Sequence, residues 1–445
     1  MYDELKFENC NHSKDPILGC ALEGVASVAA GIKDASIVIH SPQGCASTVG
    51  AAYDTHEVDF TRRKIACTRL FETDVIMGAS DKLKDMIKEA DKTFRAKTMF
   101  VIGTCAADII GEDIKGICRK MQSEVNAKLI PILAGGFRGN SNDGLNLGLE
   151  ALLPFIKEVD RIPNSVNIIA PQANINPTWW ADLKWVKDIL NFLGITVVSV
   201  LPYDISLSDL ENAGGACANI LLSHDVGYEF AYKMQEKYEI PLILSDIPLP
   251  IGLKNTARWI RALAEYFYVG EKAEELILKG EEMVADILRK RALMIIPRYR
   301  NCRVSVSADA TMGISILRML FEELEMIPEV ILLRSETISA RNILEKELED
   351  LHIHPKLAFS VDGYQIKQAL TNIDVDVVIG SAWEKYMAEE VGIKVAFDVF
   401  NPTNRDVYVD RAYFGYEGML NILEVFGNDW ERSFRSKEIN FEQYI

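Results

Sequence analysis

The chain has 445 residues, of which 49% are hydrophobic and 25% are charged, an ordinary balance for a globular protein. Its formal net charge of −17 argues against nucleic-acid binding, which requires a basic surface to displace counterions. No apolar stretch is long enough to span a membrane, and the polar N-terminus lacks the apolar core of a signal peptide, so we expect a cytoplasmic protein.

Short apolar runs alternate with longer amphipathic segments from one end of the chain to the other. The stretch 302–333 repeats the order strand, small-residue turn, helix and strand. Helices are predicted at 80–94, 111–125 and 179–194. Strands are predicted at 36–40, 74–79, 98–104, 128–134, 165–170, 195–202, 374–381 and 393–399.

This alternation predicts an α/β protein with mostly parallel sheets flanked by helices. The pattern resets near residues 160 and 300, which predicts three Rossmann-like domains. We place them at 1–160, 161–295 and 296–445, with a long helical segment at 254–293 before the third domain and a helix at the C-terminus.

Eight cysteines lie at 10, 20, 45, 67, 105, 118, 217 and 302, without a Cys-x-x-Cys pair. Most lone cysteines are small buried hydrophobic residues, and we interpret Cys118 and Cys302 in this way. Cys20, Cys45 and Cys105 differ, because each follows a glycine or a glycine–threonine pair. Cys45 and Cys105 come one turn after a predicted strand, and Cys20 precedes an Ala-rich stretch that is typical of a helix.

In a parallel sheet, ligands bind beyond the carboxyl ends of the strands. Three thiolates that meet there, without a nearby histidine, favour an iron–sulfur cluster over other metal sites. Their spacing alone also allows three unrelated buried thiols. No Walker A sequence and no Gly-x-Ser-x-Gly elbow offers a competing chemistry.

Several motifs in order resemble the nitrogenase component 1 type oxidoreductases. "GCALEGVASVAAGIKDASIVIHSPQGC" is similar to the first two cluster-ligand segments of that family, and "TRLFETDVIMGASDKL" to its Glu-x-Asp-x-x-x-Gly element. "FVIGTCAADIIGEDI" resembles the element that carries the third ligand. Similarity continues to "FGYEGMLNILE", and therefore covers nearly the whole chain.

The resemblance implies that Cys20, Cys45 and Cys105 hold one half of an iron–sulfur cluster shared with a partner subunit. It is an 8Fe-7S P-cluster in nitrogenases and a 4Fe-4S cluster in some relatives. Cys67 is an additional candidate ligand, although a core thiol is the simpler interpretation. The implied partners are an α-like homologous subunit in a heterotetramer, or a second copy, and an ATP-dependent homodimeric iron protein.

Catalytic α-type subunits hold a second cofactor with a cysteine in the middle domain and a histidine near the C-terminus. No histidine follows residue 396, and the register suggested by "EKYEIP" places Ser223, rather than Cys217, nearer the ligand position. "IPLPIGLKNTARW" is also more similar to β-type subunits. We therefore expect a β-like chain without a complete active-site cofactor of its own, and no catalytic residue is assigned.

The expected function is electron relay within a nitrogenase-like reductase, from the iron protein to a substrate-reducing metal site. Dinitrogen, a methylthio-alkane and a tetrapyrrole are candidate substrates. The alternative is an assembly scaffold that holds a cofactor precursor without turnover.

Overall fold

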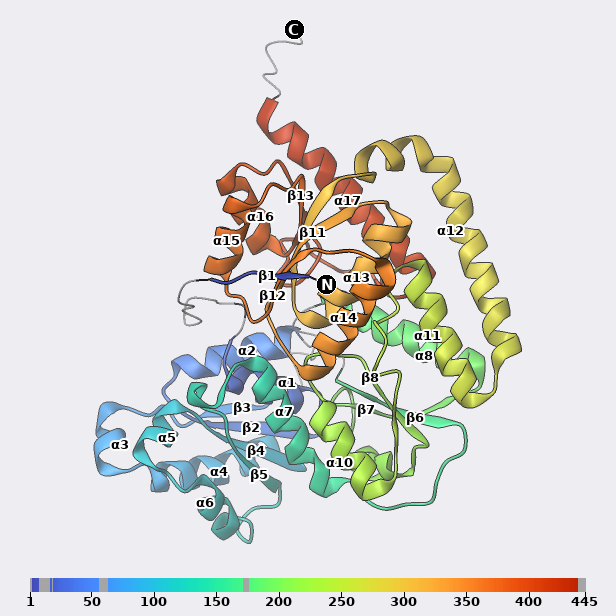
Figure 1. Ribbon diagram of the computed structural model, residues 1–445. Helices are drawn as coiled ribbons and strands as arrows, with labels where there is room; N and C mark the ends of the chain where they lie inside the picture. The colour runs from blue at the N-terminus through green and yellow to red at the C-terminus, as the bar shows by residue number, and fades with distance from the viewer. Residues whose placement is uncertain (1, 8–16, 18, 56–62, 171–175, 439–445) are drawn as a thin grey trace.

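The computed structural model describes residues 2–7, 17, 19–55, 63–170 and 176–438, so Cys10 lies outside the described part. It contains three sheets whose strands all pair in parallel (Figure 1). The predicted α/β class with parallel sheets is therefore confirmed. Within the described parts of the chain, no helix combines the length and apolar character that a membrane span needs.

The first sheet has the order β3-β2-β4-β5. Its strands are β2 (Ala35–His40), β3 (Ile65–Cys67), β4 (Thr98–Gly103) and β5 (Lys128–Leu133). The accompanying helices are α1 (Ala21–Ala30), α2 (Gly44–Thr55), α3 (Glu72–Met77), α4 (Ser80–Phe94), α5 (Cys105–Ile110), α6 (Ile114–Met121) and α7 (Ser141–Leu152), with the short turns η3 (Gly136–Arg138) and η4 (Leu153–Phe155).

Both faces of this sheet are buried, which explains its continuous apolar strands. Ile37 and Ile39 point toward α1 and α7, whereas Val38 points toward α4 and α6. The thiol-bearing loops at the carboxyl ends of the strands are therefore supported by a rigid, doubly covered layer.

The second sheet has the order β7-β6-β8-β9. Its strands are β6 (Ser165–Ile169), β7 (Thr196–Leu201), β8 (Ala218–Leu221) and β9 (Leu242–Ile243). Its helices are α8 (Trp179–Leu193), α9 (Leu207–Glu211), α10 (Tyr228–Tyr238), α11 (Gly252–Phe267) and α12 (Gly270–Tyr299), with the turn η5 (Asn212–Gly215). Two helices thus replace the single segment predicted at 254–293, because Tyr268 adopts a left-handed φ of 58° between them.

The third sheet has the order β1-β12-β11-β10-β13-β14. Its strands are β1 (Asp3–Glu4), β10 (Arg303–Ala308), β11 (Ile327–Leu333), β12 (Lys356–Ala358), β13 (Val377–Gly380) and β14 (Val395–Asp398). Its helices are α13 (Ala310–Arg318), α14 (Ile338–Leu351), α15 (Gly363–Asn372), α16 (Ala382–Val391) and α17 (Gly415–Glu438), with the π-helical turn η6 (Met319–Glu323). The N-terminal strand β1 departs from the expected division, because it pairs with β12 and not with the first sheet.

The strand predicted at 74–79 is wrong, because this segment forms most of helix α3. None of the six residues of α3 is buried, and the side chains of Ile76 and Met77 are 80% and 84% exposed. The apolar run therefore covers a surface instead of filling a core. The strand that pairs beside β2 is the shorter β3, which the sequence pattern did not indicate.

Helices α1 and α7 approach closely through glycines. A Cβ atom at Gly144 would lie 2.0 Å from the carbonyl oxygen of Ala21, and one at Gly24 would lie 2.0 Å from that of Ser141. Only glycine permits this contact, which fixes the N-terminus of α1 beside the loop before α7.

Replacing Gly144 with alanine should therefore destabilise the protein by roughly 1–3 kcal/mol, since α1 and α7 must move apart. Gly50→Ala is the control, because a Cβ at this helical glycine meets no atom within 4 Å. Denaturant unfolding measures both effects; equal stability of the two variants would contradict the close contact.

A buried carboxyl joins α8 to the segment before α17. Asp182 accepts hydrogen bonds from the backbone N–H groups of Tyr413, at 2.6 Å, and Phe414, at 2.9 Å. Burial raises the pKa of Asp182 to about 7 despite these donors.

The native carboxyl of Asp182 thus binds a proton more tightly than the unfolded one, and its contribution to stability falls as pH rises from about 4 to about 7. We expect Asp182→Asn to abolish this part of the pH dependence. Thermal melts of both proteins between pH 5 and pH 8 give the difference. If the melting temperatures of the wild type and the variant changed with pH in parallel, the raised pKa of Asp182 would not be the source of the pH dependence.

Candidate metal centre

The carboxyl ends of the four strands of the first sheet bring polar and sulfur-bearing residues to one edge. β3 ends at Cys67, β2 leads through Ser41 to Cys45, and β4 leads through Thr104 to Cys105. β5 leads into a glycine pair at 135–136. Because all four strands are parallel, these loops lie next to one another.

Cys20 reaches the same edge from the N-terminus of α1. It occupies the N-cap position in an extended conformation, with φ −137° and ψ 170°. The next amide, of Ala21, donates to the carbonyl of Gly139 at 3.1 Å. The helix predicted after Cys20 is thus present, and its N-terminus is held by the loop that follows β5.

Gly136 lies between Cys20 and Cys105. Its amide N–H donates to Cys105 Sγ at 2.9 Å. A Cβ atom at Gly136 would lie 3.5 Å from that sulfur and 3.9 Å from Cys20 Cβ. The absence of a side chain at position 136 therefore lets the backbone approach both cysteines.

Cys45 completes the group. Burial raises the pKa of the Cys45 thiol, and the charges of Cys105 and Cys20 raise it further. The structure therefore places all three cysteines within electrostatic reach of one another. All three are only partly buried, as a site at a subunit boundary requires.

Two hydroxyls accompany the thiols. Ser41 and Thr104 each form a hydrogen bond with Cys45, and these bonds oppose the rise in its pKa. Thr104 Oγ1 also donates to the carbonyl of His40 at 3.3 Å. The sequence interpretation missed both residues, although each lies close to a selected cysteine in the chain.

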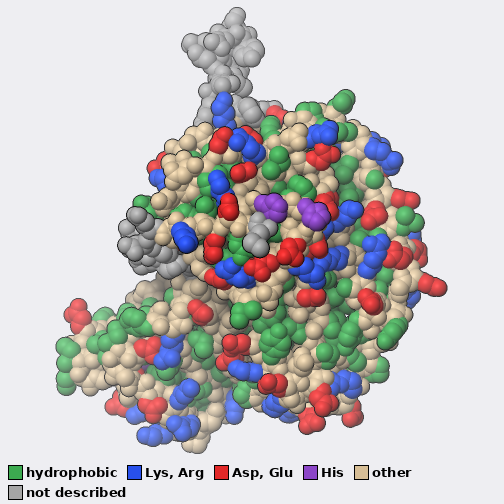
Figure 2. Space-filling view, in the orientation of Figure 1, with side chains coloured by type: hydrophobic (Ala, Val, Ile, Leu, Met, Phe, Trp, Pro, Cys, Tyr) green, Lys and Arg blue, Asp and Glu red, His purple; other side chains and the backbone are tan. Residues whose placement is uncertain are grey.

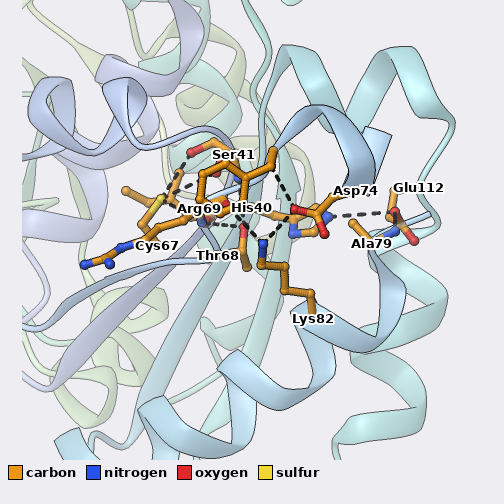
Figure 3. Close-up of polar contacts among 11 residues, drawn as sticks. His40, Ser41, Cys67, Thr68, Arg69, Asp74, Ala79, Lys82 and Glu112 are labelled. Atoms are coloured by element: carbon orange, nitrogen blue, oxygen red, sulfur yellow. Dashed lines mark hydrogen bonds and ion pairs between the residues drawn. The ribbon is translucent and has the colours of Figure 1, made fainter. Parts of the chain in front are cut away.

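Cys67 lies beside this group and contacts Ser41. Its Sγ is 3.6 Å from Ser41 Oγ and accepts the N–H of Arg69 at 3.5 Å (Figure 3). Ser41 therefore stands between Cys67 and Cys45. The structure keeps Cys67 near the site without placing it among the three selected thiols.

Glu112, between α5 and α6, contacts both the buried His40 at the end of β2 and the N-terminus of α4. His40 is fully buried, and its Nε2 lies 3.8 Å from Glu112 Oε2 (Figure 3). Burial lowers the pKa of His40 more than Glu112 raises it, so the imidazole is neutral at pH 7. Glu112 also accepts hydrogen bonds from the N–H of Ala79 and the hydroxyl of Ser80.

An ion pair between Arg138 and Asp108 fixes the loop that contacts Cys105 to helix α5. Arg138 Nε and Nη2 donate to the two carboxylate oxygens of Asp108 at 3.2 and 3.0 Å. A bidentate pair of this kind fixes orientation as well as distance. It holds the glycine pair against the helix that begins at Cys105.

The remaining cysteines lie elsewhere. Cys118 is buried, and burial raises the pKa of its thiol to about 12. Cys217 precedes β8, at the amino end of the second sheet, and donates to the carbonyl of Ile162 at 3.0 Å.

Ser223 follows β8, where its hydroxyl accepts hydrogen bonds from the N–H groups of Asp225 and Val226.

The three-thiol group suits a multinuclear cluster. An N–H donor to a cysteine sulfur, as Gly136 provides, is one of the contacts that tunes protein-bound iron–sulfur clusters. Among the described residues, no three Cys, His, Asp or Glu side chains approach closely enough to chelate one ion. A cluster separates its thiolates by the width of its iron core, so it tolerates wider spacing than zinc does.

Three parallel sheets with thiols gathered at the edge of the first define an α/β protein with a candidate metal centre. The family model described as "Nitrogenase component 1 type Oxidoreductase" matches residues 20–431, and the chain belongs to this family. The resemblance to the nitrogenase component 1 type oxidoreductases that the sequence motifs indicated is thereby confirmed.

Curated relatives carry two names. "Nitrogenase iron-molybdenum cofactor biosynthesis protein NifE" of Methanococcus maripaludis is 26% identical over 421 residues, which cover 91% of this chain and 82% of the relative. "Nitrogenase molybdenum-iron protein alpha chain" of Methanothermobacter thermautotrophicus is 26% identical over 431 residues, which cover 91% and 86%. Neither name is that of a β chain, so the β-like character stays a prediction.

A solved structure described as "Nitrogenase Cp1 at pH 6.5" superposes with a TM-score of 0.79. The match covers 98% of this chain and 97% of the other at 17% identity, which demonstrates a shared fold.

Proposed function

We propose that this chain is the cluster-binding subunit of a nitrogenase-type complex. Cys20, Cys45 and Cys105 bind one side of an iron–sulfur cluster, of the 8Fe-7S P-cluster type or 4Fe-4S, and a homologous subunit binds the other. When bound, the cluster supplies one-electron transfer. The observation that supports the proposal is that Gly136 lies against Cys105 and Cys20, while the charges of both these cysteines act on the Cys45 thiol.

A partner is supported by an apolar surface beside the thiols. Phe71, Ile76 and Met77 near or on α3, Ile109 on α5, and Phe137 are all more than half exposed. Figure 2 shows hydrophobic side chains gathered at the lower left, where Figure 1 places α3 and α5. Contiguous exposed apolar groups of this kind mark protein–protein interfaces.

Within that complex we propose a role in cofactor assembly, as a scaffold that holds a cluster precursor. Relatives named for biosynthesis of the iron–molybdenum cofactor support this role over turnover. The second candidate is electron relay in a reductase, with electrons from an ATP-dependent iron protein; the relatives named as α chains favour it. The candidate substrates remain dinitrogen, a methylthio-alkane and a tetrapyrrole.

Anaerobic co-purification with its partner tests the proposal. The complex should be brown and contain iron and acid-labile sulfide. A scaffold transfers its cluster to an acceptor apoprotein and reduces no substrate, whereas a reductase subunit supports turnover with iron protein, ATP and reductant. A folded, iron-free complex after reconstitution with iron and sulfide would reject both roles.

A further inference from the structure

Helix α12 carries large apolar side chains on its solvent-facing side. Its buried face includes Ala273, Ile277 and Val284. Leu278 and Leu293 are instead 58% and 93% exposed. Figure 1 shows this helix along the right edge of the molecule, on the opposite side from α3 and α5 at the lower left. Single exposed leucines are common on proteins, so the charged residues beside them decide whether they mark a contact surface.

A line of exposed residues runs along this side of α12. They are separated by four, seven and four positions, and a helix returns to nearly the same side after each of these steps. We call them the α12 stripe, which consists of Leu278, Glu282, Arg289 and Leu293.

The order of the α12 stripe is symmetric, with charges of opposite sign at matching positions. Leu278 and Leu293 are equally distant from a midpoint directly after Ala285, and so are Glu282 and Arg289. We consider two copies of the helix that run antiparallel about a twofold axis at this midpoint. Leu278 of one copy then faces Leu293 of the other, and Glu282 faces Arg289. The stripe is therefore complementary to itself, as an interface with twofold symmetry requires.

The two charges of the α12 stripe are not neutralised within the chain. Nearby, Asp286 pairs with Lys290 one turn further along the helix, at 2.5 Å. Arg289 donates to the carbonyl of Ala285 in its own helix, and neither it nor Glu282 forms an ion pair with a described residue. These two side chains lie two turns apart, about 10 Å along the helix axis, so they do not pair with each other.

The charge of the whole helix follows the same division. Six acidic residues and two lysines lie between 270 and 286, whereas four basic residues and no acidic residue lie between 287 and 299. In the antiparallel arrangement the acidic half of each helix faces the basic half of the other. Complementary potentials of this kind favour the correct register and suppress a parallel arrangement, in which like charges would meet.

We propose that α12 pairs antiparallel with α12 of a second copy of this chain, around a twofold axis at the midpoint of the α12 stripe. The facing leucines bury apolar surface, and the two Glu282–Arg289 pairs fix the register. Because α12 lies on the other side of the molecule from α3 and α5, this pairing leaves the thiol edge free for a homologous subunit. The proposal is independent of whether the chain binds a cluster.

The molar mass of the purified chain, measured by light scattering at tens of micromolar, tests this pairing. Glu282→Arg and Arg289→Glu each place like charges opposite each other in the pair. Each should raise the dissociation constant about tenfold or more and halve the mass. An equal mixture of the two variants should regain the wild-type mass, because every facing pair then joins opposite charges. The double variant, with both changes in one chain, should also keep the wild-type mass.

Lys272→Glu is the matched control, because it makes the same change in charge as Arg289→Glu at an exposed position of α12 outside the stripe. It should keep the wild-type mass. If the wild type has the same mass as the single variants, the stripe contacts solvent or a different protein, and the proposal fails. A mixture that stays at the lower mass, or a control that loses mass as Arg289→Glu does, would also overturn it.

Discussion

Replacing Cys45 with alanine should remove most of the cluster iron and its electron paramagnetic resonance signal. Cys45 is the thiol on which the charges of Cys20 and Cys105 both act, and the hydroxyls of Ser41 and Thr104 contact it. Loss of this central sulfur leaves two ligands on this side of a shared cluster. Two thiolates give weaker binding, because each removed metal–sulfur bond must be replaced by solvent or a poorer donor.

Cys302→Ala is the matched control, since its thiol is also partly buried but donates to the carbonyl of Arg298 at 3.0 Å, far along the chain from the site. This variant should retain its iron and its spectrum. Iron and acid-labile sulfide are measured per chain after anaerobic reconstitution. If both variants lose iron equally, the choice of thiols is wrong.

Cys67→Ala distinguishes a fourth ligand from a neighbour. Because Ser41 separates Cys67 from Cys45, we expect full iron content with only a small change in spectrum. Loss of iron comparable with that in the Cys45 variant would show that Cys67 binds the cluster directly.

The regular parts of the fold could be predicted because local pattern and burial agree. Strand β2 carries a continuous apolar run at 37–39, since Ile37 and Val38 are buried on opposite faces of a covered sheet. Helix α4 was predicted at its observed bounds, because its apolar residues recur at helical spacing and its opposite face is charged.

The failure at 74–79 has a physical cause. Ile76 and Met77 are as apolar as the residues of a core strand, yet they are exposed on α3. A sequence does not distinguish burial within its own core from burial against a partner. Strand β3 was missed for a different reason, because its three residues are too few to show a period.

The candidate site was only partly visible in the sequence. Parallel strands bring their carboxyl ends together, so a thiol after β2 and one after β4 could be expected to meet. The contact between Gly136 and Cys105 depends instead on the conformation of the loop after β5. Contacts between the second and third sheets, such as the hydrogen bond from the N–H of Thr311 on α13 to Asp225 after β8, depend on how the sheets pack, which no local pattern encodes.

Replacing Glu347 with alanine should produce a large loss of stability away from the metal centre. This carboxylate lies on α14 and is 1% exposed. It accepts a hydrogen bond from Arg258 on α11. The Nε and Nη2 atoms of Arg318 on α13 lie 3.0 and 2.9 Å from its Oε2 atom. Its removal takes the shared counter-charge from two partly buried guanidinium groups, of which Arg318 keeps a contact with Glu322 at 3.2 Å. Breaking a buried pair in this way costs about 3–5 kcal/mol.

Glu274→Ala provides the matched comparison, since Glu274 also pairs with an arginine in a bidentate manner. Arg261 Nε and Nη2 donate to it at 2.6 and 2.9 Å, but both side chains are more than half exposed. Water screens that pair, so its loss should cost only about 0–1 kcal/mol. Urea unfolding of the two variants gives both values. If the two losses were equal, burial would not be what makes the Glu347 pair strong, and the three helices would have to be held together by their apolar contacts alone.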